Sequence, residues 1–414
     1  MNVLHVVSGN MNEGASRGAY WLHQGLRQLG INSKILTNGK TILNDENVVG
    51  VSQDLKSKIF NSLRGRLDMM PSILYRNRKK IIFSTGFVGF DFTKNQLYKD
   101  ADIVHLHWIN GGFVNLRHIA KIDKAIVWTM RDMWPMTGGC HVAEALQCDR
   151  YIYGCGKCKQ LGSFLSLDLS RMIVNRKKRL IPKNIKLIGI SDWLSEKARA
   201  SYLFKKFDIR TIHNNINTND FFPIEKQIAK DIIGIKTSKK IVLCGAINSN
   251  NFYKGFDNFV DAVSKLDRQG IYLVFFGEIN EELVANLGFE YKNMGCLNDI
   301  ISLRLVYSAS NVFVAPSLMD AFGKTLAESL ACGTPVVCFN ATGPKDIVDH
   351  KINGYKAEPY DSEDLAEGIN WVLNAINYEE ISQEARRKVV TKFDSKVIAE
   401  KYIKLYCEIL SKKC

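Results

Sequence analysis

Short apolar runs alternate along the chain with polar, glycine-containing turns and with amphipathic stretches of helical period. The clearest runs are Val3–Ser8, Asp102–Trp108, Ala125–Thr129, Lys186–Ser191, Lys240–Ala246, Ile271–Phe276 and Asn311–Ala315. Runs of this length, rich in β-branched residues, are typical of strands that a parallel sheet buries on both faces. Strands that alternate with helices predict an α/β fold, and 414 residues leave room for two ordinary domains.

One stretch, residues 316–337, combines a strand end, an acidic loop and a helix in the sequence PSLMDAFGKTLAESLACGTPVV. We expect Asp320 in the loop and Glu328 in the helix, both facing the crevice outside the carboxyl ends of the strands. The backbone N–H groups of the helix start can hold a phosphate or a sugar oxygen. A carboxylate on the helix suits a vicinal diol such as ribose. The alternative is an acidic loop residue and a solvated helix glutamate.

This stretch resembles the E-x7-E signature of the retaining glycosyltransferases of family 4, with Asp320 in place of the first glutamate. The resemblance implies that the first acid lies near the donor sugar and that Glu328 binds the nucleotide ribose. It also implies the GT-B fold, with two Rossmann-like, doubly wound domains facing a central cleft. We expect the first domain over residues 1–185, completed by a helix at about 395–414, and the second over residues 190–394.

The second predicted domain opens with a strand and turn that end in Gly245-Ala246, followed by Lys254-Gly255. Many family 4 enzymes have G-R-x…K-G here, with Arg and Lys gripping the donor diphosphate. Ala246 replaces the Arg, so Lys254 is the expected cationic contact, since a point charge can neutralise a leaving diphosphate. The alternative is a surface lysine. The predicted catalytic residues are Lys254, Asp320 and Glu328, and the predicted donor-binding residues are Gly245, Lys254, Asp320, Phe322, Gly323, Lys324, Thr325, Leu326 and Glu328.

The first predicted domain begins with a strand, a glycine-containing loop over residues 9–18 and a helix from Ala19 to Leu29. Family 4 enzymes have a small-residue loop here that approaches donor and acceptor, a role open to Gly14 and Gly18. The alternative, to which we give equal weight, is that this loop is an ordinary turn with no role in binding. His105 and His107 share one face of a strand, where a role in the core or in lining the acceptor site is favoured over metal binding, because a third ligand is not evident.

The segment from Trp128 to Cys140 reads WTMRDMWPMTGGC, and cysteines follow at 148, 155 and 158. It resembles a branch of family 4 that builds colanic acid, capsule or O-antigen polysaccharide, where W-T-x-H-D-x-W-x-x-T-G-x-C precedes a similar cysteine set. Arg131 stands where the branch usually has His, and could hold an anionic group such as an acceptor phosphate. The predicted acceptor-side residues are Gly14, Gly18, His107, Arg131 and Asp132.

Four cysteines within 19 residues, in a chain without a recognisable secretion signal, suggest a tetrahedral zinc site that pins a long loop. The ligands would be Cys140, Cys148, Cys155 and Cys158, with His141 as a substitute for one of them. The alternative is a set of buried or free thiols. We expect the ten cysteines to be thiols or metal ligands more often than disulfides. No cofactor is expected to be required for catalysis.

Positive charge is concentrated in the first half of the chain. Residues 1–200 hold 30 Lys and Arg against 15 Asp and Glu, a net charge of +15, whereas residues 201–414 hold 26 and 27, a net charge of −1. An anionic membrane surface, a lipid-linked diphosphate and nucleic acid all fit this field, and nucleic acid ranks last because no motif for it is present. No run of about 18 apolar residues predicts a transmembrane helix, so we expect a cytoplasmic protein.

The strongest basic segment, residues 56–80, holds eight Lys and Arg against Asp68 alone. Leu55, Ile59, Leu63 and Leu67 recur every four residues and predict one apolar helix face. Such a helix can lie on anionic lipid, peripheral to the inner face of the plasma membrane. The alternative is a surface helix packed on its own domain with a solvated basic face.

Together these features predict a hexosyltransferase, and the resemblance to family 4 implies that it retains the anomeric configuration. It would transfer a hexose from a nucleotide-diphospho-sugar to a saccharide or polyprenyl-diphosphate-linked acceptor in bacterial surface polysaccharide biosynthesis, as for lipopolysaccharide, O-antigen or capsule. Two alternatives stay open: a sugar-nucleotide epimerase of the same fold, and a non-catalytic scaffold with a decayed site. Base, sugar, linkage and acceptor are not legible from the sequence.

Overall fold

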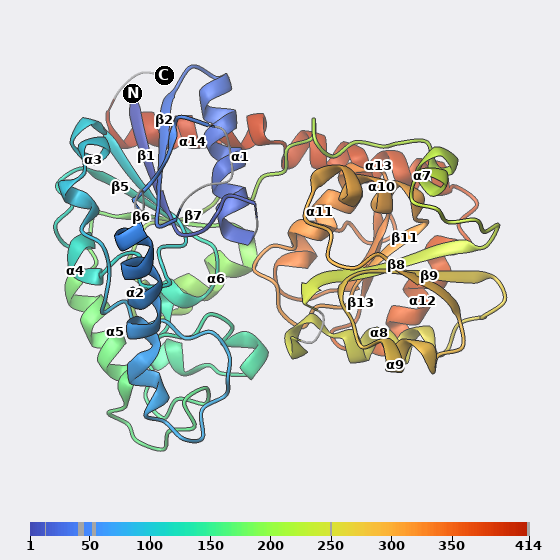
Figure 1. Ribbon diagram of the computed structural model, residues 1–414, viewed down its shortest axis with the longest axis horizontal. Coiled ribbons are helices and arrows are strands. Elements are labelled where there is room, and N and C mark those ends of the chain that lie inside the picture. The colour runs from blue at the N-terminus through green and yellow to red at the C-terminus, as the bar shows by residue number, and fades with distance from the viewer. Residues whose placement is uncertain (13, 40–44, 52–54, 249–250, 412–414) are drawn as a thin grey trace. The chain divides into compact units, whose positions relative to one another are not determined.

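A computed structural model describes residues 1–12, 14–39, 45–51, 55–248 and 251–411. The chain divides into two compact units, one formed by Met1–Asn214 with Ser395–Cys414 and the other by Asn215–Asp394 (Figure 1). Among the described residues, no helix combines the length and apolar character that crossing a membrane requires.

The first unit is built on a parallel sheet in the order β3-β2-β1-β4-β5-β6-β7. Its strands are β1 (Asn2–Val7), β2 (Asn32–Thr37), β3 (Val48–Gly50), β4 (Ile103–Leu106), β5 (Ala125–Met130), β6 (Lys186–Gly189) and β7 (Ile209–Thr211). The central strands are apolar on both faces and almost fully buried, as expected for a parallel sheet covered by helices.

Helices and the C-terminal segment cover this sheet (Figure 1). They are α1 (Gly14–Gln28), α2 (Leu55–Ile73), α3 (Gln96–Asp100), α4 (Leu116–Ile119), α5 (Leu169–Leu180), α6 (Asp192–Ala200) and α14 (Ser395–Ile409). Helix α14 packs beside α1, where a Cβ on Gly25 would lie 2.6 Å from the carbonyl oxygen of Ser395. Ile398, Tyr402 and Tyr406 thereby join the same apolar cluster as Val3 and Leu22.

The second unit repeats the plan with the strand order β10-β9-β8-β11-β12-β13. Its strands, all parallel, are β8 (Lys240–Asn248), β9 (Ile271–Glu278), β10 (Glu290–Asn293), β11 (Val312–Ala315), β12 (Val336–Phe339) and β13 (Gly354–Ala357). Its helices are α7 (Lys226–Ile232), α8 (Phe256–Val263), α9 (Glu281–Ala285), α10 (Ile300–Ala309), α11 (Lys324–Ala331), α12 (Ser362–Leu373) and α13 (Tyr378–Lys392). Helices α8, α9 and α12 lie on one face, and α10, α11 and α13 on the other (Figure 1).

Both sheets contain a topological switch point. In each, the first strand of the unit pairs with the second on one side and with the fourth on the other, so the connections leave the sheet in opposite directions. Ligands of doubly wound sheets bind in the crevice that this reversal opens at the carboxyl ends of the strands. The crevices lie after β1 and β4 in the first unit and after β8 and β11 in the second.

The structure corrects two sequence-based boundaries. The units meet at Asn214 and Asn215, not near residues 185–190, because β6 and β7 extend the first sheet through pairing with β5. Helix α1 begins at Gly14, not at Ala19. Gly14 and Gly18 therefore lie in the first turns of a helix whose start faces the switch point, and not in a loop.

Candidate functional site

The loops after β8 and β11 are packed together at the switch point of the second unit. Gly255 has a φ of +69°, and a Cβ there would lie 1.9 Å from the carbonyl oxygen of Pro316. Only glycine allows this approach. The backbone N–H of Leu318 donates to the carbonyl oxygen of Tyr253 over 2.9 Å and fixes the two loops to each other. The sequence therefore places Lys254 directly against the acidic loop that contains Asp320.

Lys254 and Asp320 form an ion pair, with Nζ 2.9 Å from Oδ2. Both side chains are about one-quarter exposed. Burial by itself lowers the pKa of Lys254, but the charge and the hydrogen bond of Asp320 outweigh it and raise the pKa overall. Lys254 thus carries a full positive charge at neutral pH, and an anionic ligand at this site would compete with Asp320 for it.

Helix α11 positions the second predicted acid. It follows Gly323, which has a φ of +101° and where a Cβ would lie 3.0 Å from Cδ1 of Leu326. Glu328 is buried, and its Oε2 accepts a hydrogen bond from the hydroxyl of Tyr307 at 3.2 Å. The Nζ of Lys324 lies 3.8 Å from Oε1, one helical turn away. A carboxylate held this way is oriented by its neighbours before any ligand arrives.

The other predicted donor-side residues line or support the same place. Gly245 follows the part of β8 that pairs with β11, and a Cβ there would lie 2.5 Å from the ring of Phe276. Phe322 is buried against Phe393, with the ring centroids 5.4 Å apart, so its side chain anchors the loop in the core of the second unit. Leu326 is also buried, and its N–H donates to the carbonyl oxygen of Gly323. Thr325 belongs to the first turn of α11.

At the switch point of the first unit, Arg131 joins most of the predicted acceptor-side residues. It follows β5 and is 8% exposed. Its Nη1 donates to Oδ1 of Asn214 over 2.5 Å and its Nη2 to Nδ1 of His107 over 3.3 Å. A Cβ on Gly18 would lie 2.4 Å from Nη1, so glycine leaves space for the guanidinium. The Cβ of Gly14, by contrast, would have no described atom within 4 Å.

A chain of neutral histidines continues from Arg131 into the sheet. Because the guanidinium can only donate, His107 accepts at Nδ1 and carries its proton on Nε2. That nitrogen lies 2.8 Å from Nδ1 of His5. His105 contacts the hydroxyl of Tyr406 at 2.6 Å and that of Thr129 at 2.7 Å. Burial, with the nearby charge of Arg131, lowers the pKa of all three histidines well below the ordinary value.

These three histidines also place their ring nitrogens within 4.8 Å of one another. The third partner that the sequence did not reveal is His5, on the strand next to β4. The fixed charge of Arg131 beside this cluster opposes a divalent cation. The histidines therefore serve as a buried hydrogen-bond network beneath Arg131.

Asp132 braces the loop that follows Arg131. Its Oδ2 accepts from the indole Nε1 of Trp108 at 2.7 Å and lies 2.6 Å from Nδ1 of His141. Its Oδ1 accepts from the backbone N–H of Trp134 at 2.8 Å. Both carboxylate oxygens of Asp132 therefore stabilise the conformation of this loop, and His141 is one of their hydrogen-bond partners.

The four cysteines of the same loop gather in one buried cluster. The sulfur atoms of Cys140 and Cys158 lie 4.0 Å apart. Within the described chain, no three of the four sulfurs all lie within 4.8 Å of one another. Eight described cysteines have free thiols, whereas Cys407 is disulfide-bonded and departs from the sequence-based expectation.

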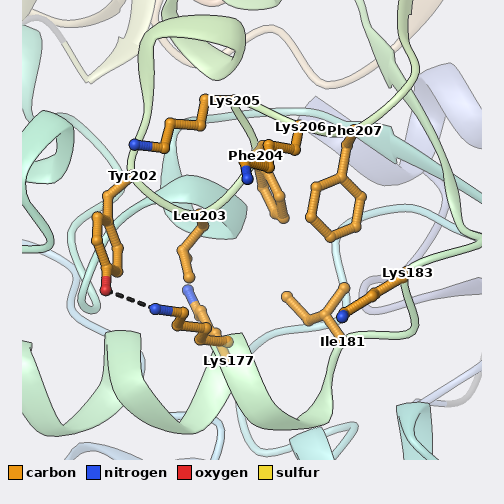
Figure 2. A pocket seen from close by; sticks show the side chains of 10 residues that line it. Lys177, Ile181, Lys183, Tyr202, Leu203, Phe204, Lys205, Lys206 and Phe207 are labelled. Atoms are coloured by element: carbon orange, nitrogen blue, oxygen red, sulfur yellow. Dashed lines mark hydrogen bonds between the residues drawn. The ribbon is translucent and has the colours of Figure 1, made fainter.

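A basic pocket of about 440 Å³ lies in the first unit between the end of α5 and the segment before β7 (Figure 2). Lys178 donates to the hydroxyl of Tyr202 at 2.7 Å along its wall. The pocket precedes β6 and β7, at the amino ends of the strands. It is therefore separate from the switch point that contains Arg131.

Sequence reasoning missed the residues that complete these sites through long-range contacts. They are His5, Asn214, Tyr402, Tyr406 and the buried Lys177 of α5. The sequence offered one signal for these contacts: His5 is a polar residue within an apolar strand, which indicates a buried side chain that needs a hydrogen-bond partner.

Comparison with known families agrees with the geometry of the second unit. Residues 225–388 match the family model described as glycosyl transferases group 1. The matched residues lie within the second unit and include Lys254, Asp320 and Glu328. An uncharacterized glycosyltransferase of Methanocaldococcus jannaschii is 26% identical over 320 residues, or 74% of this chain and 75% of that protein.

A second relative matches a shorter part of the chain. The N,N'-diacetylbacillosaminyl-diphospho-undecaprenol alpha-1,3-N-acetylgalactosaminyltransferase of Campylobacter jejuni is 25% identical over 203 residues. That match spans 47% of this chain and about half, 53%, of the relative.

Solved structures show that the whole chain has the GT-B fold, with two parallel-sheet Rossmann-like domains. Sucrose-phosphate synthase from Thermosynechococcus elongatus superposes with a TM-score of 0.72 at 18% identity, over 99% of this chain and 100% of that one. HepE of Anabaena, in complex with UDP and glucose, gives a TM-score of 0.66 at 16% identity, over 98% and 99% of the two chains.

Acid should destabilise the first unit before carboxylates titrate. The unfolded histidines bind protons below about pH 6.5, whereas His5, His105 and His107 stay neutral when folded. The unfolded state then holds more protons, so the free energy of unfolding falls by up to about 4 kcal/mol per pH unit below pH 6.5. Urea unfolding followed by tryptophan fluorescence measures this, because five of the six tryptophans precede residue 200. A His5→Asn variant should show a shallower slope, and equal stability at pH 7.5 and 5.5 would contradict the account.

Proposed function

We propose that the protein is a hexosyltransferase that uses a nucleotide-diphospho-sugar as donor and transfers the hexose with retention of configuration. The observation that carries this proposal is the meeting of Lys254, Asp320, Gly323 and Glu328 at one switch point, within the residues that match the group 1 model. A site for a nucleotide-diphospho-sugar needs positive charge for the diphosphate, which a lysine and a helix start supply. It also needs hydrogen-bond acceptors for the sugar hydroxyls, which the two acids supply.

In this proposal, each group has a separate task. Glu328 binds the ribose diol, in an orientation set by Tyr307. Lys254 exchanges Asp320 for the diphosphate and, with the start of α11, stabilises the charge that develops on the leaving group. Asp320, released from that ion pair, faces the donor sugar. No side chain is assigned as a covalent nucleophile, so we favour attack by the acceptor from the face that the diphosphate leaves.

The first unit is the proposed acceptor side. Arg131 presents a buried guanidinium at a switch point, where a phosphate or diphosphate of a lipid-linked saccharide could pair with it. The Campylobacter relative is named for an undecaprenol-diphosphate-linked acceptor, which supports this class of substrate. We accordingly place the reaction in bacterial surface polysaccharide biosynthesis, of the lipopolysaccharide, O-antigen or capsule kind.

Helix α2 supports a further element of the proposal, contact with an anionic membrane. Among its described side chains, the helix buries polar residues and exposes apolar ones. Arg64, Asp68 and Ser72 are at most 8% exposed, and Asp68 accepts hydrogen bonds from the N–H groups of Thr85 and Phe87. The exposed residues, spaced as one helical face and its extension, are Ile59 (62%), Leu63 (46%), Leu67 (40%), Met70 (58%) and Leu74 (83%).

The predicted apolar face is therefore present, but it does not pack on its own domain. Leu55, Lys56 and Lys58 belong to the predicted segment, and their side chains lie outside the described residues. A second exposed apolar group comes from the loop before α5, with Phe164 at 88%, Leu165 at 66% and Leu167 at 80%. This loop is attached to the end of α2, since the N–H of Leu169 donates to the hydroxyl of Tyr75 over 2.9 Å.

Basic residues surround these apolar groups, and the exposed ones are Arg66, Arg76, Lys79 and Lys80. Apolar side chains flanked by cations match a lipid surface with anionic headgroups. Helix α2 also lies against the turn that follows β4, where a Cβ on Gly112 would be 2.5 Å from the carbonyl carbon of Arg64. The proposed membrane surface is thus next to the proposed acceptor side. The protein would act in the cytoplasm, on the inner face of the plasma membrane.

Two rival functions make different predictions. A non-catalytic scaffold is favoured by the departures at Arg131, Ala246 and Asp320 from the family pattern, and it should release no nucleotide from any donor. A sugar-nucleotide epimerase should change the sugar without net release of nucleotide. Transfer or slow hydrolysis of one donor, with stoichiometric nucleoside diphosphate released, separates the proposal from both.

Donor binding should depend on Lys254 and Glu328. Thermal shift with UDP, GDP, ADP and their sugars should identify one nucleotide that stabilises the wild type, by about 2.7 kcal/mol at 100 times its Kd. Lys254→Met and Glu328→Gln should lose most of this stabilisation. The matched control is Lys265→Met, which removes a lysine whose one ionic partner within the described part of the chain is the exposed Glu363. Nucleotide release should fall at least 100-fold in Lys254→Met, consistent with the loss of one charge-stabilising group. Equal binding by Lys254→Met and wild type would exclude the assigned site.

Membrane binding should depend on the exposed face of α2. The wild-type protein is expected to sediment with vesicles that contain phosphatidylglycerol, less with pure phosphatidylcholine, and less at high salt because salt screens the basic residues. Leu67→Glu combined with Leu74→Glu should abolish sedimentation without unfolding the protein, since both side chains are exposed. Ile376→Glu, at an exposed apolar residue of the second unit, is the control. Sedimentation that is unchanged in the double variant would refute this surface.

A further inference from the structure

The cysteine cluster of the first unit has the composition and burial of a metal site. Cys140, Cys148, Cys155 and Cys158 are each at most 9% exposed. Four thiolates around zinc, at about 2.3 Å each, place neighbouring sulfurs about 3.8 Å apart. The 4.0 Å between Cys140 and Cys158 is close to this spacing. Binding would require the other two sulfurs to turn inward, because they are not yet within 4.8 Å of both members of this pair.

Backbone N–H groups lie beside three of the four sulfurs. N–H groups donate to three of the sulfurs: that of Arg150 to Cys148, that of Gly138 to Cys155, and those of Gln160 and Leu161 to Cys158. The turn that delivers Cys155 and Cys158 has positive φ at Gly154, Cys155, Gly156 and Lys157. The N–H groups of residues 155–158 donate in turn to Arg150 O, Ser170 Oγ, Leu165 O and Asp168 Oδ2, and these hydrogen bonds fix the positions of both cysteines.

An independent observation is the buried cation beside the cluster. Lys177 of α5 is fully buried, and in the described chain no carboxylate lies within ion-pair distance of it. Its Nζ donates to the carbonyl oxygens of Trp134 and Thr137 and lies 3.6 Å from the ring centroid of Trp134. A buried ammonium without an acid is costly unless negative charge lies close by.

One peptide group links this cation to the cysteines. The carbonyl oxygen of Thr137 accepts from Lys177, and the N–H of the same peptide, on Gly138, donates to the sulfur of Cys155. The peptide dipole is therefore aligned between an ammonium and a sulfur, which favours negative charge on that sulfur. Gly138 is required here, since a Cβ would lie 2.3 Å from the carbonyl oxygen of Ser170.

We propose that Cys140, Cys148, Cys155 and Cys158 bind one zinc ion as thiolates, and that Lys177 offsets the charge of this site. Zinc with four thiolates carries a net charge of −2, which the ammonium partly compensates. The ion would have a structural role. It would hold the loop that contains Asp132 and His141, together with the loop of Phe164 and Leu165, to the start of α5. Asp168 already fixes Cys158 there, accepting from its N–H at 2.8 Å.

Metal analysis of the full-length protein tests the cysteine part. Protein purified from zinc-supplemented cells should contain about one zinc per chain by mass spectrometry, as a four-thiolate site requires. Its cobalt-exchanged form should show thiolate-to-cobalt charge-transfer absorption. Cys148→Ser with Cys158→Ser should lose both signals, while Cys296→Ser, at an exposed thiol of the second unit, should keep them. Wild-type protein that takes up no stoichiometric zinc overturns the proposal even if the double variant does not fold, and so does zinc retained by a folded double variant.

The role of Lys177 has its own test. Lys177→Met should weaken zinc binding about 10- to 100-fold, as the loss of outer groups of a metal site does, in competition with a chromophoric chelator. Lys178→Met is the matched control, because the adjacent side chain is exposed and bonds only to the hydroxyl of Tyr202 among the described residues. Equal zinc affinity in Lys177→Met and Lys178→Met would remove Lys177 from the site and leave the four cysteines as ligands.

Discussion

The reversal of strand order in each parallel sheet is the constraint on which the rest of the structure depends. After β1 and β4, and again after β8 and β11, the chain leaves the sheet in opposite directions. Side chains and backbone N–H groups at those strand ends therefore lack a covering helix. Lys254 and Asp320 meet at one reversal and His107 and Arg131 at the other, although each pair is far apart in the sequence.

Lys254 and Arg131 at these reversals, and Lys177 beside the cysteine loop, are buried or half-buried cations, and each is stabilised differently. Lys254 has the carboxylate of Asp320, so its charge is secured and its pKa is raised. Arg131 has neutral acceptors, Asn214 and His107, and burial lowers its pKa to about 10. Lys177 has two carbonyl oxygens and an indole face, and burial lowers its pKa to about 7. A cation with only neutral partners is costly in a protein interior, which is why Arg131 and Lys177 carry the proposals for an anionic acceptor and a thiolate centre.

Helix α2 reverses the usual relation between burial and polarity. Among its described side chains, Asp68 attaches it to the first unit by accepting N–H groups from the segment at residues 85–87, and Asn61 does so by donating to the carbonyl oxygen of Asn38. Leu63, Leu67 and Met70 are left on the outside as a consequence. If the cysteine loop binds metal, the same ion would also fix the neighbouring apolar loop, because the N–H of Lys157 donates to the carbonyl oxygen of Leu165.

The sequence by itself determined the local elements and which residues form the candidate donor site. Apolar runs, glycine turns and the acids at 320 and 328 depend on spacing within one segment, which a sequence displays directly. Only the tertiary structure decided that β6 and β7 belong to the first sheet, that His5 completes the network under Arg131, that α2 turns its leucines outward, and that Lys177 lies beside the cysteines. The physical reason is that burial and hydrogen bonding in these cases come from partners tens to hundreds of residues away, and local periodicity carries no record of them.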